Sequence, residues 1–131
     1  MTLLYDKFLA WFTSDWDTGI IAKPNVFNKT KQKYNPPNSI GFDDLAEPIN
    51  RIVSNDDELG KAHTFFLELN GLTDVDLEKL IEATTKLVQA YSATNERWYP
   101  LGLSPLTERF GYRQKIMSCS AEITYEEASY G

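Results

Sequence analysis

A strand followed at once by a long amphipathic helix constrains the fold of this chain more than any other feature. In residues 62–70, Phe65, Leu67 and Leu69 occupy alternate positions, as in a strand that buries one face. Gly71 ends the segment. We expect residues 62–70 to form a central strand whose apolar face is covered by helices.

The helix is predicted to run from Val75 to about Thr94. Thr73 precedes it and is placed to accept hydrogen bonds from the free amide groups of the first turn. Asp76 and Glu78 lie in that turn, where the helix dipole favours negative charge. The buried face is expected to consist of Leu77, Leu80, Ile81, Thr84, Val88 and Tyr91.

A second strong signal lies near the C-terminus, where apolar and polar residues alternate over residues 115–126. The apolar face is expected to contain Met117, Cys119, Ala121, Ile123 and Tyr125. A strand of this length spans about 35–40 Å, which is long for a strand that lies over a single helix. It is either a contact surface between subunits or the central strand of a wide sheet.

The N-terminal part predicts a helix and an extended segment. Residues 3–14 carry an apolar stripe at helical spacing, and Trp16 is expected to fold back onto this helix. Residues 19–28 favour extended structure, but Pro24 cannot donate to a ladder and makes the segment an edge or interrupted strand. Residues 28–38 are polar and contain two prolines, which predicts a loop.

Residues 39–53 allow two interpretations. Their apolar residues fit a helical stripe, but Pro48 would fall past the first turn, where it removes a hydrogen bond and clashes with a preceding carbonyl. The alternative is a strand over Ser39–Glu47 and a second over Ile49–Val53, and we favour the strands. Residues 54–60 are predicted to be a turn on either interpretation.

Residues 97–103 predict a short strand that Pro100 pushes towards a sheet edge, and residues 104–111 predict a loop. The order of elements indicates an α+β fold. We expect a mostly antiparallel sheet with an N-terminal helix and one long central helix packed on one face. The length and an apolar fraction of 42% suit a single domain over residues 1–131.

The sequence contains few residues that could carry chemistry. One cysteine, Cys119, excludes an intramolecular disulfide and a Cys-rich zinc site, and one histidine, His63, leaves no intrachain pair for a metal or a relay. The paired acids are explained by turns and by a helix start. We therefore expect a non-enzymatic protein with no catalytic residue, no cofactor and no metal site. No apolar run approaches the roughly 20 residues of a membrane helix, so we expect no membrane partner.

The charge is unevenly distributed around a net value of −6. A basic segment is followed by an acidic one, and one copy's basic segment could meet another copy's acidic one. The alternative without a functional role is a pair of solvated loops of opposite charge. The candidate interface residues are Lys23, Lys29, Lys31, Lys33, Asp43, Asp44, Glu47, Asp56, Asp57 and Glu58.

Nucleic acid is the less favoured partner. Basic residues lie beside aromatic ones near Tyr34 and near Phe110, an arrangement that can stack bases and neutralise phosphates. The net negative charge and the neighbouring acidic segments argue against it, because nucleic-acid binding requires a basic face.

The order of elements resembles the tail-terminator and tail-completion (minor tail) proteins of long-tailed phages. The resemblance rests on four segments, LLYDKFLAWF, GIIAKPNVFN, TFFLELNGLTDVDLEKLIEATTKLVQAY and KIMSCSAEITYEE. It implies a structural protein of the virion, assembled in the host cytoplasm, that forms a homo-oligomeric ring on the tail tube. The implied partners are further copies of the chain and other tail or neck proteins.

A different class of protein fits the same composition. Immunity proteins and phage-encoded inhibitors of host defence are short, acidic binding proteins without catalytic motifs, and their acids steer association with a basic partner. On this alternative the acids of residues 43–58 would form one binding surface, and the protein would be monomeric or dimeric alone.

Overall fold

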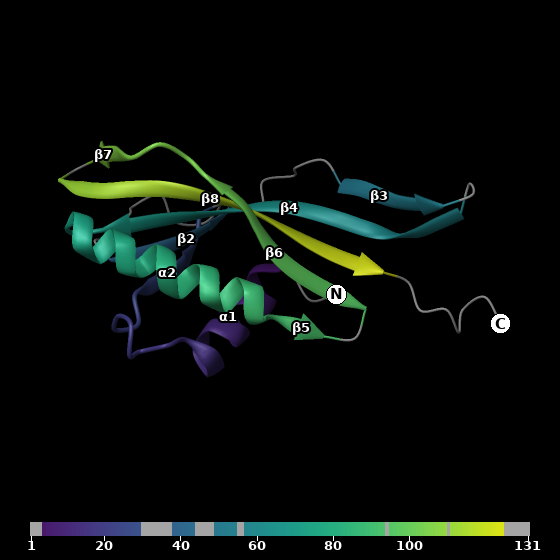
Figure 1. Cartoon of the computed structure of the whole chain (residues 1–131), viewed down its shortest axis with the longest axis horizontal. Coiled ribbons are helices and arrows are strands. Elements are labelled where there is room, and N and C mark those ends of the chain that lie inside the picture. Colours follow the sequence, from purple (N-terminus) through teal and green to yellow (C-terminus); the bar gives the residue numbers. More distant parts are fainter. Residues whose placement is uncertain are drawn as a thin grey trace.

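Two long strands form the centre of the sheet. The computed structural model describes residues 4–29, 38–43, 49–54, 57–93, 95–109 and 111–124. Strand β4 (Asp57–Gly71) pairs antiparallel with β8 (Tyr112–Thr124) in a continuous register from Gly60 opposite Thr124 to Gly71 opposite Arg113 (Figure 1). Since β8 has strand neighbours on both sides, its length is explained by a central place in a wide sheet.

The other strands extend this pair on both sides, in the order β1-β2-β4-β8-β6-β5. Strand β3 also pairs with β4, and β7 also pairs with β8. Among the described strands, only β1 and β2 are parallel. The bounds are β1 (Asn25–Asn28), β2 (Ser39–Asp43), β3 (Ile49–Ser54), β5 (Ser92–Ala93), β6 (Glu96–Leu103) and β7 (Thr107–Arg109).

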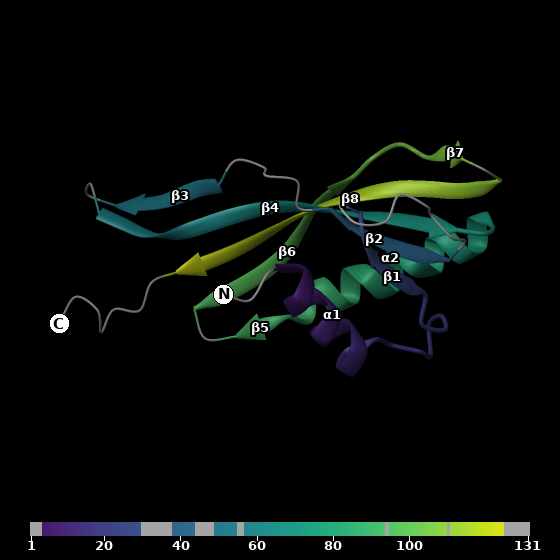
Figure 2. The ribbon, with the colours of Figure 1, turned by 180° about the vertical axis from the view of Figure 1, so that it is seen from behind.

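Both described helices cover the same face of the sheet. They are α1 (Leu4–Asp15) and α2 (Asp74–Ala90), and the view from behind shows them on one side of the central strands (Figure 2). Strand β3 and the part of β4 that pairs with it extend past this helical layer (Figures 1 and 2). Neither helix is long and apolar enough to cross a membrane.

The core between the helices and the sheet is rich in aromatic rings. Phe42 contacts Phe8 at 5.5 Å and stacks on Phe65 at 5.0 Å between ring centroids. Phe65 contacts Trp98 at 5.1 Å, and these four side chains are at most 2% exposed. The continuous apolar contact between layers holds the helices against the sheet.

The predicted α+β class and most of the predicted elements are confirmed. Trp16 is 6% exposed and packs against Phe12, as expected for a residue that folds back onto α1. Residues 39–43 and 49–54 are strands, as favoured over a helix, while residues 44–48 lie outside the described residues. The predicted loop also lies mostly outside them, over residues 30–37.

Three predictions of element bounds are wrong. The turn predicted at 54–60 is strand from Asp57 on, because pairing with β3 stabilises the polar segment as a ladder. The loop predicted at 104–111 contains β7, which pairs with the start of β8. The long helix ends at Ala90, where Tyr91 turns to extended backbone and leads into β5. The edge or interrupted strand predicted within residues 19–28 is confirmed as β1, which begins after Pro24 and lies at the end of the strand order.

Candidate interaction surface

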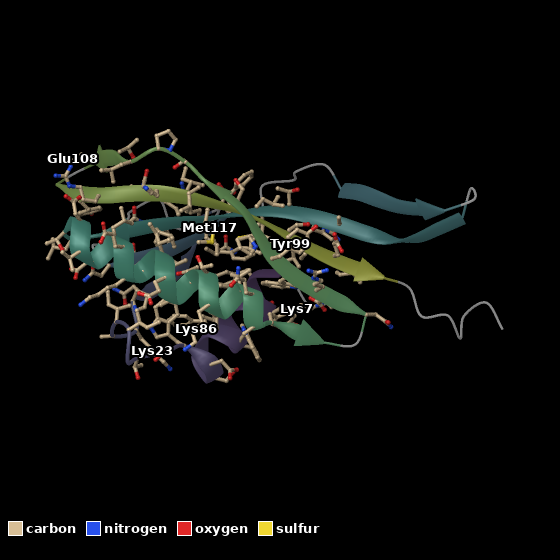
Figure 3. The ribbon with its side chains drawn as sticks, in the orientation of Figure 1. Lys7, Lys23, Lys86, Tyr99, Glu108 and Met117 are labelled. Carbon is tan, nitrogen blue, oxygen red and sulfur yellow. The ribbon has the colours of Figure 1, made fainter. Side chains whose placement is uncertain are left out.

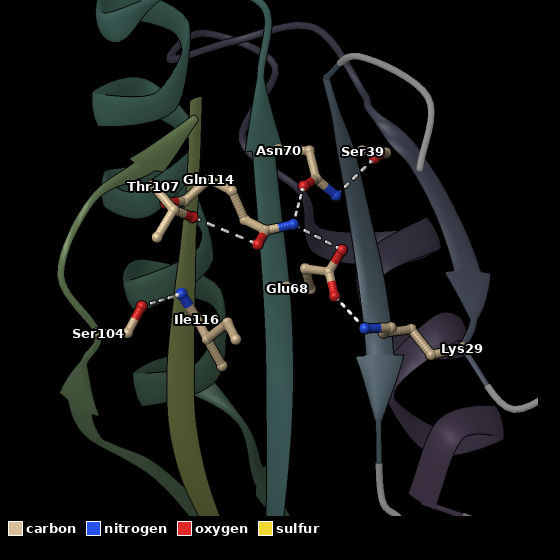
Figure 4. A network of polar contacts seen from close by, with 8 residues as sticks. All are labelled: Lys29, Ser39, Glu68, Asn70, Ser104, Thr107, Gln114 and Ile116. Carbon is tan, nitrogen blue, oxygen red and sulfur yellow. Dashed lines mark hydrogen bonds and ion pairs between the residues drawn. The ribbon is translucent and has the colours of Figure 1, made fainter. Parts of the chain in front are cut away.

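The helix-free face of the sheet carries a row of polar side chains that cross-link neighbouring strands. Asn70 Nδ2 donates to Ser39 Oγ at 3.1 Å, and Gln114 Nε2 donates to Asn70 Oδ1 at 2.8 Å (Figure 4). These three residues face one another in the ladder from β2 to β8 and are at most 7% exposed. Their hydrogen bonds satisfy buried polar groups, so this part of the face is rigid.

A buried carboxylate continues this network. Glu68 is 3% exposed, accepts a hydrogen bond from Gln114 Nε2 at 2.8 Å, and forms an ion pair with Lys29 (Figure 4). Lys29 follows β1 and reaches Glu68 across the intervening strand β2. The cation and the hydrogen-bond donor together offset the free-energy cost of removing the carboxylate from water.

Gly41 makes the crossing possible. It lies opposite Glu68 in the register of β2 and β4. A Cβ atom at this position would stand 2.8 Å from Cζ of Phe27 and 2.9 Å from Cγ of Lys29, closer than real contacts allow. The missing side chain therefore provides the space through which Lys29 reaches the carboxylate.

Strand β6 forms the other side of this surface through a bulge. Pro100 lies opposite Cys119 and Gly102 lies opposite Ser118, so Leu101 is an extra residue without a partner in β8. Proline lacks an N–H group for the ladder, and bulges are where sheets accommodate it. The bulge presents Leu101 and Leu103, which are 55% and 46% exposed.

The segment after β6 is fixed to β8 by two hydrogen bonds. The amide of Ser104 donates to the carbonyl of Ile116 at 2.9 Å, and the Ser104 hydroxyl accepts from the amide of Ile116 at 2.8 Å (Figure 4). These bonds fix the end of β6 to β8. The position of the segment that borders the groove is therefore set by the fold.

The result is an open groove of about 550 Å³ on the helix-free face. Its apolar lining consists of Phe66, Leu101, Leu103 and Ile116. Its charged lining consists of Lys29, Asp43 and Glu68. A concave, largely apolar surface with a few polar groups is suited to receive apolar side chains of a partner.

The structure separates the predicted interface residues. Lys29 and Asp43 both line the groove. Lys23 lies instead beside α1, where its ammonium donates to the carbonyl of Thr13 at 2.9 Å and stands 5.9 Å from the centroid of the Phe12 ring (Figure 3).

The remaining predicted residues fall into two sets. Asp57 and Glu58 belong to β4, where their backbone pairs with β3. The others, which lie outside the described residues, are Lys31, Lys33, Asp44, Glu47 and Asp56.

Sequence reasoning missed most of the groove. The alternation in residues 62–70 places Glu68 on the face opposite Phe65, Leu67 and Leu69, but it cannot reveal the ion pair with Lys29, because that contact joins segments far apart in the chain. Leu101 and Leu103 were assigned to an edge strand. The signal that could have found the groove is Pro100 followed by Gly102, since both residues inside a strand pattern mark a bulge.

Burial and hydrogen bonding raise the pKa values of Cys119 and Tyr99. Burial raises the pKa of the Cys119 thiol to about 12, so this side chain stays protonated. The pKa of Tyr99 is raised, chiefly because its hydroxyl donates to the Glu122 carboxylate. Within the part of the chain that the structure describes, no group of three or more His, Cys, Asp or Glu side chains is placed to hold a metal ion.

Comparison with known proteins gives one likeness of fold. The sequence matches no protein-family model and no curated protein. The structure is similar to a chain in the virion of a native gene transfer agent particle, with a TM-score of 0.64 and 12% sequence identity. The similarity covers 93% of this chain and 95% of that chain, so the likeness of fold extends over most of both chains.

Proposed function

We propose that this chain is a structural protein of a phage-like particle and that it acts by assembling with copies of itself. The observation that carries the proposal is the likeness of fold to a virion chain, which extends over 93% of this chain and leaves no large part of either chain unmatched. A likeness of such extent favours a shared structural role over a shared local motif.

The surface described above is consistent with assembly. The groove offers a mainly apolar lining, and among the described residues no group of three or more His, Cys, Asp or Glu side chains is placed to hold a metal ion. Its rigid polar network holds the helix-free face in shape before any partner arrives. Preformed surfaces of this kind lower the cost of ordering on association.

The finer role that we propose is that of a tail terminator. Identical subunits would form a ring at the end of a tail tube, with other tail or neck proteins as further partners. A ring requires that each subunit use two different surfaces, because head-to-tail contacts around an axis close only in this way.

Light scattering of the purified protein tests the proposal. We expect a discrete species larger than a dimer, either at all concentrations or on raising the concentration. Measurements at two salt concentrations show whether charge or apolar burial drives the association. A strict monomer at every concentration and salt would contradict self-assembly.

A further inference from the structure

Strand β1 is held at the end of the strand order by a short ladder. It pairs with β2 over four positions, from Asn25 opposite Ser39 to Asn28 opposite Phe42. The pairing is parallel, and parallel ladders are slightly less stable per residue than antiparallel ones. Side-chain contacts therefore carry a large share of the attachment of β1.

Two side chains fasten β1 across β2. Phe27 and Lys29 both lie over Gly41, where a Cβ atom would stand 2.8 Å from Cζ of the ring and 2.9 Å from Cγ of the lysine. Phe27 is 5% exposed, and Lys29 pairs with the carboxylate of Glu68 on β4 (Figure 4). Because both side chains rest on the same glycine, β1 cannot leave β2 without displacing both of them.

The ion pair makes this displacement costly. Glu68 is 3% exposed, with one carboxylate oxygen on Lys29 and the other accepting from Gln114. Lys29 directly follows β1, so its ammonium leaves the carboxylate when the strand departs. Breaking a buried ion pair costs far more than breaking an exposed one. The pair therefore opposes a partial opening of β1.

We infer that β1 and Lys29 form a strap over the edge of the sheet, which opens and closes as one unit and is latched by Glu68. With the strap closed, the sheet presents β1 at this edge. With the strap open, it presents β2, whose backbone groups towards β1 are then available to another strand. The strap determines which strand edge the single chain offers, independently of the proposed assembly.

Two amide protons report directly on the strap. The amide of Asn25 donates to the carbonyl of Asn38 at 3.2 Å, and the amide of Lys29 donates to the carbonyl of Phe42 at 3.0 Å. These bonds lie at opposite ends of β1, and hydrogen exchange followed by NMR measures how often each one opens. We expect equal protection at the two amides, below that of β4 and β8. Unequal protection at the two ends would overturn opening as one unit.

Lys29→Met tests the latch, because it removes the ammonium and keeps most of the aliphatic side chain. Both amides should then exchange at least about tenfold faster. The matched control is Lys7→Met, which breaks the Lys7–Glu96 pair, a pair of similar burial at 2.9 Å that joins α1 to β6. This control should leave exchange at Asn25 and Lys29 unchanged.

Lys29→Met/Glu68→Gln separates the latch from overall stability. The glutamine keeps the shape of the side chain and removes the charge that Lys29→Met leaves behind, so resistance to denaturant should recover relative to the single variant. The two strap amides should nevertheless exchange faster than in the unmodified protein. Exchange at the unmodified rate in either Lys29 variant would overturn the inference, as would equal acceleration in Lys7→Met.

Discussion

At the scale of single residues, the groove depends most on Gly41. Replacing it with alanine places a Cβ atom within 3.0 Å of both the Phe27 ring and the Lys29 side chain. We expect Gly41→Ala to lower the free energy of unfolding by about 1–3 kcal/mol, because overpacking forces the ring or the ion pair to move. Denaturant unfolding measures the change.

Gly102→Ala is the matched control for this prediction. Gly102 also lines the groove, but a Cβ atom there meets nothing within 4 Å. Its unfolding should stay close to that of the unmodified protein. Equal unfolding midpoints for the two alanine variants would show that the space at Gly41 is not required.

Cys119 gives a prediction about pH. Its thiol has a pKa of about 12 in the folded chain against 9.0 when it is exposed. Above pH 9 the unfolded chain loses this proton while the folded chain keeps it, so stability falls as the pH rises. The contribution is on the order of 1 kcal/mol between pH 8 and pH 10. The free energy of unfolding should therefore fall more steeply with pH in the unmodified protein than in Cys119→Ala, and equal slopes would contradict the account.

Alternation in the sequence predicted which residues are buried in the two central strands. Phe65, Leu67 and Leu69 are fully buried, as is Cys119. The same alternation placed Glu68 on the opposite face but could not show that this residue is also buried. That burial depends on Lys29, which follows β1 and reaches the carboxylate over Gly41 of β2, and no local pattern encodes this contact.

At the scale of elements, α2 depends on its first residues. The Thr73 side chain accepts a hydrogen bond from the amide of Asp76 at 3.1 Å. We expect Thr73→Ala to lower the free energy of unfolding by about 0.5–2 kcal/mol, because an amide of the first turn loses its partner. Thr73→Ser keeps the hydroxyl and should lose much less; a similar loss in both variants would rule out the cap as the cause.

The elements that were predicted correctly are those whose signal is local. Helix α2 has its own cap and apolar stripe, and Pro48 was enough to favour strands over a helix in the residues around it. The predictions that were wrong concern strands that are stabilised by hydrogen bonds to a neighbouring strand. The polar start of β4 and the short strand β7 gain their structure from β3 and β8, so their own composition indicated a turn and a loop.

At the scale of the whole molecule, the fold class could be predicted but the groove could not. The order of helices and strands indicated helices on one face of a mostly antiparallel sheet, which the structure confirms. The groove is assembled from β2, β4, β6 and β8, and its shape depends on the bulge at Leu101. Such a feature follows from the register between strands, which only the structure gives.

The central proposal is that this chain assembles with itself into a closed ring. Native mass spectrometry tests it most directly, because the mass of each assembled species divided by the 15.0 kDa of the chain gives the number of copies. We predict one discrete species with more than two copies. A monomer alone at every concentration, an assembly that stops at the dimer, or an open series of increasing masses would contradict the account.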